Sequence, residues 1–258
     1  MPPETKLGRV RLVGAGPGAA DLLTVRALRA IEGAQALLYD ALISEEVLAL
    51  APAACLKIQT GKRAGRTSMS QDTINRLMLR LARRGLEVVR LKGGDPSIFG
   101  RVGEERAFLA RHGVETEIVP GVTAASAAAA QFGFPLTHRG VARRLLISTA
   151  TTKDGAMTEG GWEAAADLQT TLALYMGRDQ LQAATERLVA RGRSPDTPAI
   201  AIENAGRPDA RALPGTLSDL GAILAAAQLS GPVVLLVGEV TTQADVAVPL
   251  PQAARAFA

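Results

Sequence analysis

Short apolar runs alternate, in the first half of the chain, with segments in which leucine, isoleucine and alanine recur at helical spacing. The runs are Arg9–Val13, Gln35–Tyr39, Leu56–Gln59, Glu87–Leu91 and Glu115–Val119. Repeated strand and helix signals of this kind predict a mainly parallel sheet that is covered by helices. Ligands of such sheets bind beyond the carboxyl ends of the strands, so the residues that follow each run are the first candidates for a site.

A break at Pro120-Gly121 separates this pattern from a second, looser one. After an alanine-rich helix predicted over Thr123–Gln131, the second half shows four more apolar runs and two helical segments. The runs are Leu145–Ser148, Thr171–Met176, Ala199–Ile202 and Val233–Val237, and the helical segments are Gln180–Ala190 and Leu217–Ala227. Residues Asn204–Pro214 are typical of a hairpin or loop. We therefore predict two α/β domains, residues 1–120 with a mainly parallel sheet and residues 121–245 with a mixed one, followed by a tail at 246–258.

The cysteine and histidine counts argue against a disulfide-stabilised or metal-binding protein. Cys55 is the single cysteine among 258 residues, and His112 and His138 are the two histidines. The sequence therefore excludes an internal disulfide and makes a zinc site difficult to build, so we expect no metal. It contains no run of about 20 apolar residues, and its first residues lack the apolar core of a secretion signal. We expect a cytoplasmic protein with no membrane partner.

The charge distribution points to an acidic partner. The formal net charge is +4, and 24 of the 29 cationic residues are arginine. Through Pro120 the chain carries 18 Lys and Arg against 13 Asp and Glu, whereas the remainder carries 11 against 12. Arginine offers a planar fork that binds carboxylate or phosphate with two hydrogen bonds. Aromatic residues make up only 3% of the chain, so platforms for base stacking are scarce and we expect no nucleic acid partner.

A glycine-rich loop follows the first apolar run. Its sequence, Gly14-Ala15-Gly16-Pro17-Gly18-Ala19, satisfies the pattern G-x-G-x-x-A, and Asp40 ends the second run, as in a nicotinamide or flavin site. Asp21 would lie at the start of the following helix, where a carboxylate disfavours a bound pyrophosphate. The loop therefore fits either close approach of the backbone to a ligand that need not be phosphate, or a tight turn without a ligand.

The fourth apolar run leads into a second glycine-bearing loop, Lys92-Gly93-Gly94-Asp95-Pro96. The two glycines leave backbone N–H and C=O groups open to a ligand, and Pro96 favours an extended conformation of Asp95. A carboxylate held beside bare backbone suits a ribose diol or an ammonium group, although the same residues also suit a plain turn. Because both loops follow strands of one predicted parallel sheet, we expect them to open at the same edge.

Two further positions follow predicted strands. Thr123 comes at a helix start, where its hydroxyl fits either a helix cap or a donor to a ligand. Met176 ends a later run and fits either contact with a flat aromatic ring or core packing.

Nine segments of the chain carry a more specific signal. They occur in order between Val10 and Val240 and read LVGAGPG, LLYDALIS, TGKRAGR, VVRLKGGDPSIFGR, VPGVTAASAAAA, GFPLTHRG, LYMG, SPDTPAIAIENA and LLVGEV. Together they resemble the tetrapyrrole methylase family. The resemblance implies two α/β domains with the ligands in the cleft between them, a homodimer, and S-adenosylmethionine as a methyl donor that leaves as S-adenosylhomocysteine. It also implies addition of two methyl groups to uroporphyrinogen III, at carbons 2 and 7, to give precorrin-2 on the routes to cobalamin, sirohaem and haem d1.

The resemblance also implies roles for individual residues. It places cofactor contacts at Pro17, Gly93, Gly94, Asp95, Ile98, Thr123, Ala124, Met176 and Ala205. It assigns Asp40 as a proton acceptor and Lys62 as a proton donor. Considered without the resemblance, Asp40 also fits a helix-capping or salt-bridged carboxylate, and Lys62 fits a solvated basic loop.

The implied substrate is an acidic tetrapyrrole with eight carboxylates, and this accounts for the arginine excess. We expect two basic loops to face it, and we expect its binding to weaken as salt screens exposed charges. The substrate-binding residues of these loops are Arg63 and Arg66, next to Lys62, and Arg139, Arg143 and Arg144.

Several alternatives stay open at this point. Within the same fold, the chain fits a methylase of a later corrin precursor and, more distantly, one that modifies ribosomal RNA or diphthamide. From a different class, the first glycine loop fits a flavin or nicotinamide oxidoreductase. The basic charge by itself also fits a binding module without catalytic activity.

Overall fold

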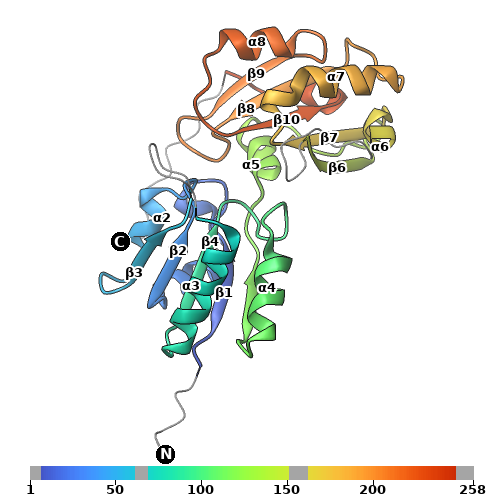
Figure 1. Ribbon diagram of the computed structural model, residues 1–258. Helices are drawn as coiled ribbons and strands as arrows, with labels where there is room; N and C mark the ends of the chain where they lie inside the picture. Colours follow the sequence, from blue (N-terminus) through green and yellow to red (C-terminus); the bar gives the residue numbers. More distant parts are fainter. Residues whose placement is uncertain (1–6, 62–68, 151–161, 248–258) are drawn as a thin grey trace, which may run out of the picture. The chain divides into compact units, whose positions relative to one another are not determined.

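The computed structural model describes residues 7–61, 69–150 and 162–247. The chain divides into two compact units, residues 1–123 and residues 124–258 (Figure 1). We describe each unit by itself. In the described ranges, every helix is too short or too polar to span a bilayer.

The first unit contains a five-stranded sheet in the order β3-β2-β4-β1-β5, and all of its strand pairs are parallel. The strands are β1 (Val10–Gly14), β2 (Ala36–Tyr39), β3 (Leu56–Gln59), β4 (Val88–Lys92) and β5 (Thr116–Val119). Each strand agrees with its predicted run to within one residue. Strands β2 and β4 are mostly buried and apolar, whereas the edge strands β3 and β5 are partly exposed and contain polar residues. The prediction of a parallel first sheet is confirmed.

Helices cover both faces of this sheet. They are α1 (Val25–Glu32), α2 (Glu45–Ala49), α3 (Gln71–Arg83) and α4 (Val102–Arg111), with a short 3₁₀ helix at Ala20–Leu22. Alternate strand residues point to opposite faces: Leu37 and Val89 pack with α1 and α2, whereas Leu38 and Val88 pack with α3 and α4. With both faces covered, the place where a ligand binds a sheet of this kind is beyond the carboxyl ends of the strands.

Serine and threonine side chains define where three of these helices begin. The hydroxyls of Thr24, Ser44 and Ser70 each accept a hydrogen bond from the N–H group three residues further on. The Thr24 hydroxyl also donates to the Pro120 carbonyl, at 3.2 Å, and so links the start of α1 to the end of β5. These caps fix the lengths of the loops that follow β1, β2 and β3.

The second unit contains a mixed sheet in the order β6-β7-β10-β8-β9. Strands β6 and β7 pair in parallel, and the other pairs are antiparallel. The strands are β6 (Arg144–Thr149), β7 (Thr170–Tyr175), β8 (Pro198–Glu203), β9 (Arg211–Thr216) and β10 (Val233–Val237). The prediction of a mixed second sheet is confirmed.

Helices also cover both faces of the second sheet. The helices are α5 (Ala124–Gln131), α6 (Trp162–Ala166), α7 (Leu181–Ala190) and α8 (Leu220–Ala226), with 3₁₀ helices η2 (Arg178–Gln180) and η3 (Glu239–Gln243). Helix α5 packs through Ala125, Ala128 and Ala129 against one face of the sheet, whereas α6, α7 and α8 pack against the other. The small alanine side chains let α5 lie close to the strands.

The hairpin expected as one of two alternatives over Asn204–Pro214 is confirmed. The chain turns after β8 and returns as β9, which contains Pro214 and Gly215 and pairs with β8. Proline lacks an N–H group, so it is tolerated in a strand mainly at the edge of a sheet, which is where β9 lies. The second strand of the hairpin therefore continues through Pro214 and Gly215 to Thr216.

Candidate active site

The two glycine loops of the first unit meet at one edge of its sheet. Gly16 follows β1 and Gly94 follows the neighbouring strand β4. The two residues form a β-bridge, in which the Gly94 N–H donates to the Gly16 carbonyl at 2.7 Å and the Gly16 N–H donates to the Gly94 carbonyl at 3.2 Å. Pro17 comes next in the first loop and is half-buried. The two loops thus lie at the same edge of the sheet, as the carboxyl ends of parallel strands do. We call this edge, with Gly16 and Gly94 at its centre, the glycine rim.

The glycines at this rim have two different physical roles. A Cβ atom added to Gly14 would lie 2.7 Å from the Gly94 carbonyl oxygen, and one added to Gly121 would lie 2.3 Å from the same atom. These two residues are glycine because backbones pack against each other. Gly94 has a φ of +69°, and a Cβ atom there would meet no atom within 4 Å. At Gly94 the backbone faces open space, which a ligand can occupy.

Asp95 ties the β4–α4 loop to the segment after β5. Its Oδ1 accepts hydrogen bonds from the backbone N–H of Ser97, at 2.8 Å, and from the Ser97 hydroxyl, while its Oδ2 accepts from the N–H of Gly121, at 3.0 Å. The sequence predicts Asp95 only as a cofactor contact, but the structure also gives it a part in shaping the rim. Removing this side chain is therefore expected to disturb the loop as well as any ligand.

The residues after Asp95 adopt an unusual backbone. Phe99 and Arg101 have φ angles of +53° and +56°, and Phe99 is 42% exposed. Non-glycine residues in the left-handed region carry strain that the surrounding structure must hold, and such residues concentrate at functional sites. Ile98, a predicted cofactor contact, lies in this segment and is half-buried.

Asp40 lies directly after β2, next to the second glycine loop. Its Oδ1 accepts a hydrogen bond from the N–H of Leu42 at 3.2 Å, and its Oδ2 accepts from the N–H of Gly93 at 3.4 Å. It does not cap α2, because Ser44 does so, and it forms no ion pair within 4.0 Å with another described residue. The carboxylate is thus held over the glycine rim by backbone groups. Lys62, Arg63 and Arg66 lie outside the described residues.

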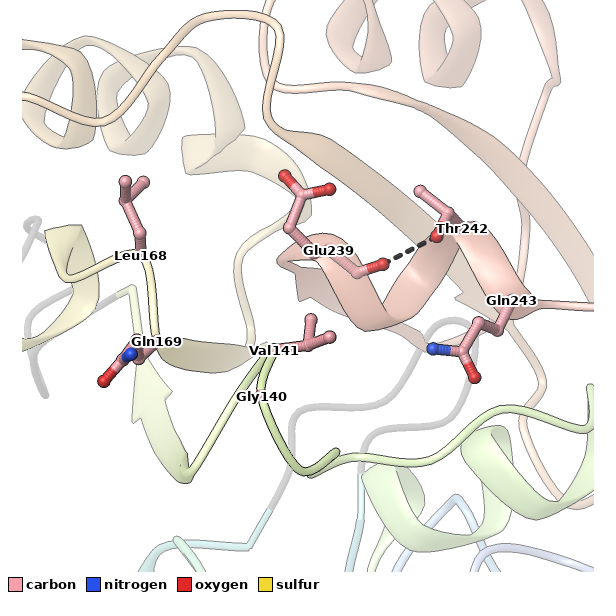
Figure 2. A pocket seen from close by; sticks show the side chains of 7 residues that line it. All are labelled: Gly140, Val141, Leu168, Gln169, Glu239, Thr242 and Gln243. Atoms are coloured by element: carbon pink, nitrogen blue, oxygen red, sulfur yellow. Dashed lines mark hydrogen bonds between the residues drawn. The ribbon is translucent and has the colours of Figure 1, made fainter.

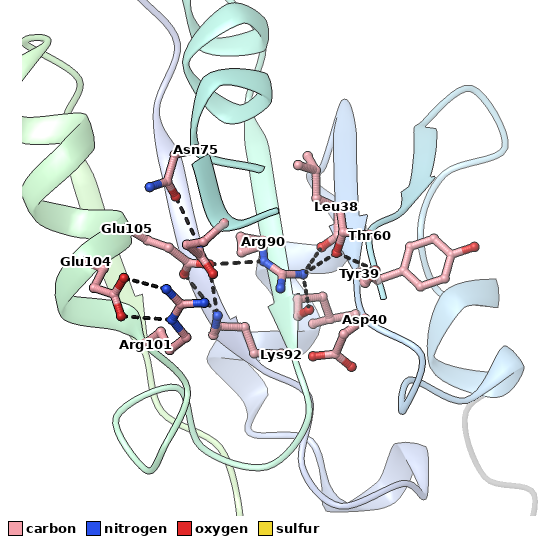
Figure 3. A network of polar contacts seen from close by, with 12 residues as sticks. Leu38, Tyr39, Asp40, Thr60, Asn75, Arg90, Lys92, Arg101, Glu104 and Glu105 are labelled. Carbon is pink, nitrogen blue, oxygen red and sulfur yellow. Dashed lines mark hydrogen bonds and ion pairs between the residues drawn. The ribbon is translucent and has the colours of Figure 1, made fainter. Parts of the chain in front are cut away.

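A buried charged network, which the sequence analysis did not identify, lies beside Asp40 (Figure 3). Glu105 of α4 is 0% exposed, and Arg90 and Lys92 of β4 are each 5% exposed. Lys92 Nζ lies 3.0 Å from both carboxylate oxygens of Glu105, and Arg90 Nε lies 3.4 Å from Oε1. In the sequence, the one sign of this network is a pair of cations, Arg90 and Lys92, at alternate positions of the otherwise apolar segment VVRLK.

The pKa of the Lys92 ammonium lies below its ordinary value. Desolvation lowers the pKa of the Lys92 ammonium, and the neighbouring Arg90 lowers it further, whereas Glu105 and Asp40 raise it. Asp40 is therefore close enough to interact electrostatically with the network.

No group of three or more His, Cys, Asp or Glu side chains in the described ranges is arranged to hold a metal ion.

The predicted cofactor residues of the second unit lie near one end of its sheet. Met176 follows β7 with a φ of +53° and is 54% exposed, so it is not core filler. The Tyr175 hydroxyl accepts a hydrogen bond from the N–H of Ala125 at 2.8 Å, which places the start of α5, with Ala124, beside the end of β7. Ala205 follows β8, which runs in the same direction as β7 because both are antiparallel to β10.

Thr123 is the last residue of the first unit and is half-buried.

Ala205 is buried, and hydrogen bonds of Gln131 connect helix α5 to the turn that contains it. The Gln131 Oε1 accepts from the N–H of Gly206 at 2.7 Å, and its Nε2 donates to the Arg207 carbonyl at 3.0 Å. The three predicted cofactor residues of this unit are thus fixed to one another.

The predicted substrate arginines of the second unit are all exposed. Arg139 lies in a tight loop closed by hydrogen bonds between His138 and Ala142, and Arg143 follows this loop. Arg144 begins β6 and pairs with Asp167. The pKa of the Asp167 carboxyl lies below its usual value. The larger cause is the hydrogen bond from the backbone N–H of Gln169, and the second is the hydrogen bond from Arg144. Arg144 would therefore have to share its charge between Asp167 and a substrate.

A hollow of about 400 Å³ lies on the second unit, beside the loop that carries Arg139 (Figure 2). It is lined by Gly140, Val141, Leu168, Gln169, Glu239, Thr242 and Gln243. These lining residues include none of the predicted catalytic or cofactor positions. We therefore assign the candidate site to the glycine rim and not to this hollow.

Comparison with known proteins identifies the family. The family described as Tetrapyrrole (Corrin/Porphyrin) Methylases matches residues 9–221. The chain belongs to the tetrapyrrole methylase family. The resemblance seen in the sequence is thereby confirmed, and membership favours the methylase interpretation of the first glycine loop over a dinucleotide site.

Individual methylases are similar over most of the chain. The uroporphyrinogen-III C-methyltransferase of Pseudomonas aeruginosa is 47% identical over 234 residues, covering 91% of this chain and 94% of that protein. A siroheme synthase of Chromobacterium violaceum is 43% identical over 240 residues, and the chain spans about half of its length, 51%. The crystal structure of the Thermus thermophilus uroporphyrin-III C-methyltransferase with S-adenosylhomocysteine superposes with a TM-score of 0.77 at 40% identity, covering 91% of this chain and 99% of that one.

Proposed function

We propose that this chain is an S-adenosylmethionine-dependent C-methyltransferase that adds two methyl groups to uroporphyrinogen III, at carbons 2 and 7, and yields precorrin-2. The observation that carries this proposal is the 47% identity over 91% of the chain to an enzyme of that name. The shared glycine rim, with Asp40 held beside it, supports the proposal from the structure. Similarity to a siroheme synthase is compatible with a place on the route to sirohaem.

The rim fits S-adenosylmethionine. Gly94 leaves an open place next to bare backbone, and the nearby residues Asp95 and Ile98 offer a carboxylate and an apolar contact. Under this proposal the cofactor contacts are Pro17, Gly93, Gly94, Asp95, Ile98 and Thr123 of the first unit, and Ala124, Met176 and Ala205 of the second. When bound, the cofactor supplies a methyl group on a positively charged sulfur and leaves as S-adenosylhomocysteine.

The protein's own contribution is alignment and proton transfer. Holding the two reactants in line is able to supply roughly 7–11 kcal/mol of the barrier. Attack by a pyrrole carbon on the methyl group leaves the ring system with a positive charge, and a proton must then leave another position of the ring system before the methylated product forms. The Asp40 carboxylate is the proposed acceptor of that proton. General acid–base help of this kind contributes about 10²–10⁴-fold. Lys62 is the proposed donor of a proton elsewhere on the macrocycle.

Arginines of two loops are the proposed substrate ligands. They are Arg63, Arg66, Arg139, Arg143 and Arg144. The exposed guanidinium groups of Arg139 and Arg143 are free to reorient toward the propionate and acetate groups of the substrate. We further propose a cytoplasmic homodimer without a nucleic acid or membrane partner. Sedimentation of the purified chain tests the homodimer.

Transfer of label from methyl-labelled S-adenosylmethionine to uroporphyrinogen III tests the proposed function. Label in the tetrapyrrole supports it. Saturable binding of S-adenosylhomocysteine without any labelled product would point to a methylase of a later corrin precursor. An absorbance scan adds a second check, because a flavin band in the purified protein would overturn the methylase assignment.

A further inference from the structure

Arg90 occupies an unusual place for a charged residue. It lies on the central strand β4 and is 5% exposed, between β2 and β1. A buried guanidinium destabilises a fold unless its charge is balanced and its N–H groups are bonded. Arg90 Nε pairs with Glu105, which it shares with Lys92, and Nη1 donates to the Thr60 hydroxyl at 3.1 Å and to the carbonyls of Leu91 and Leu38 at 3.3 and 3.5 Å.

These contacts lead directly to the residue before Asp40. The Thr60 hydroxyl, which accepts from Arg90, donates to the Tyr39 carbonyl at 2.9 Å, and the Thr60 N–H donates to the same carbonyl at 2.7 Å. Arg90 therefore binds the Leu38 carbonyl itself and the Tyr39 carbonyl through Thr60 (Figure 3). Both of these carbonyls belong to the end of β2, and the second is part of the peptide bond to Asp40.

The backbone after Thr60 closes against Asp40 from the same side. A Cβ atom added to Gly61 would lie 2.4 Å from the N atom of Ala41 and 3.1 Å from the carbonyl carbon of Asp40. Only glycine lets the end of β3 lie this close to the end of β2. The position of the Asp40 backbone thus depends on the end of β3, which Thr60 joins to Arg90.

The far side of the network is also fixed. Glu105 accepts a hydrogen bond from Gln71 of α3 at 3.0 Å, and Gln71 also donates to Asn75 at 3.1 Å. Glu105 balances one of the two buried cations, and Asp40 is the other carboxylate that acts on Lys92. Arg90 is therefore anchored to two helices at one end and to the end of β2 at the other.

We propose that Arg90, acting through Thr60 and the end of β2, is a positioning residue that aims the Asp40 carboxylate in the methylation reaction. The proposal rests on the proposed function, in which Asp40 accepts a proton. A displacement of about 1 Å at a reacting group costs roughly 10²-fold in rate. The hydrogen bonds that Arg90 and Thr60 donate to the carbonyls of Leu38 and Tyr39 limit such a displacement.

The test measures kcat, KM and S-adenosylhomocysteine affinity for Thr60→Val and Arg90→Met, each alone and combined with Asp40→Asn. Thr60→Val removes only the hydroxyl and keeps the side-chain shape, so it carries the test if Arg90→Met does not fold. We expect kcat to fall about 3- to 10-fold for Thr60→Val and about 10²-fold for Arg90→Met, with cofactor affinity unchanged. With Asp40→Asn already present, we expect either substitution to lower kcat by less than about twofold, because residues that act as a unit are not additive.

A matched control comes from the other buried arginine that binds carbonyls. Arg193 of the second unit is 1% exposed and donates to the carbonyls of Asp167 and Thr170. Because Arg193 has no link to Asp40 in this account, Arg193→Met should lower kcat by the same factor in the unmodified chain and in the Asp40→Asn variant. A full, additive loss for Thr60→Val on top of Asp40→Asn overturns the positioning role and leaves the proposed function standing. Normal kcat in Asp40→Asn overturns the positioning role together with the role of Asp40, and absence of any methyl transfer by the unmodified chain overturns the proposed function itself.

Discussion

At the scale of single residues, Gly94 and Gly113 form a natural pair for comparison. Their φ angles are +69° and +73°, and a Cβ atom added to either would meet no atom within 4 Å. Gly94 lies on the rim that we assign to the cofactor, whereas Gly113 ends α4. Both positions therefore require a left-handed backbone, but only Gly94 is proposed to contact a ligand.

We expect Gly94→Ala and Gly113→Ala to destabilise the fold by a similar amount, about 1–2 kcal/mol, because both place a side chain in the left-handed region. Only Gly94→Ala should also weaken S-adenosylhomocysteine binding, by about tenfold or more, since a steric cost of about 1.4 kcal/mol is a factor of ten. Calorimetric titration and thermal unfolding of both variants check this. Equal affinities would remove Gly94 from the cofactor site.

Asp40 allows a second prediction at this scale. Asp40→Asn keeps the size of the side chain and one oxygen that can accept the N–H of Leu42 or Gly93. We expect S-adenosylhomocysteine affinity to stay near that of the unmodified chain and kcat to fall about 10²–10⁴-fold, the usual contribution of a general base. Steady-state kinetics with uroporphyrinogen III measure the effect, and an unchanged kcat would exclude Asp40 as the proton acceptor.

At the scale of structural elements, the end of β8 is held by one buried carboxylate. Glu203 Oε1 accepts from the N–H groups of Ser230 and Gly231 at 2.7 and 2.6 Å, and Oε2 accepts from Arg211 at 2.8 Å. Burial by itself would raise the pKa of Glu203, but the N–H groups of Gly231 and Ser230 and the Arg211 guanidinium outweigh it, so the pKa lies below its ordinary value of 4.5. Glu203 thereby fixes the turn that carries Ala205.

This lowered pKa predicts a pH dependence with a definite sign. The folded state binds the Glu203 proton less tightly than the unfolded state, so the stabilisation is fully present above pH 4.5 and is lost as pH falls through the folded-state pKa. We expect Glu203→Gln to lower the free energy of unfolding at pH 7 by about 1–3 kcal/mol and by less in acid. Denaturant unfolding at several pH values measures this difference, and a loss that does not shrink in acid would contradict it.

The elements also show what sequence patterns can and cannot predict. The strands of the first sheet were predictable because apolar residues dominate the central strands and recur between helical segments at the two edges, and the rim followed from their parallel order. The bounds of β9 were not, because Pro214 and Gly215 favour a loop as much as a hairpin strand, and only its place at the sheet edge makes them tolerable. The crowding of Gly14 and Gly121 against the Gly94 carbonyl likewise depends on distances between loops that are remote in sequence.

The buried network shows the same limit for the candidate site. Arg90 and Lys92 stand in the sequence as two cations of an apolar run, and nothing local indicates that Glu105 neutralises them. Their partner comes from α4, and Thr60 comes from the end of β3. The motif residues Asp40, Gly93 and Gly94 could be named from the sequence, but the contacts that hold them could not.

At the scale of the whole molecule, the charge predicts how substrate binding depends on salt. The chain carries a net charge of +4, and the implied substrate carries eight carboxylates. We expect Arg143→Gln to raise the KM for uroporphyrinogen III about threefold at low salt and much less at about 1 M salt, where the screening length falls to about 3 Å. Arg76→Gln is the control, because Arg76 is an exposed arginine on α3 that pairs with Asp72. An equal effect of the two substitutions would assign Arg143 to the general surface.

The mass and methylation pattern of the tetrapyrrole after complete reaction with excess S-adenosylmethionine provide the most direct test. We predict a product that carries two added methyl groups, located by NMR at carbons 2 and 7 of uroporphyrinogen III. A tetrapyrrole that leaves the reaction unmethylated, or that is methylated at other carbons, would contradict the proposed function.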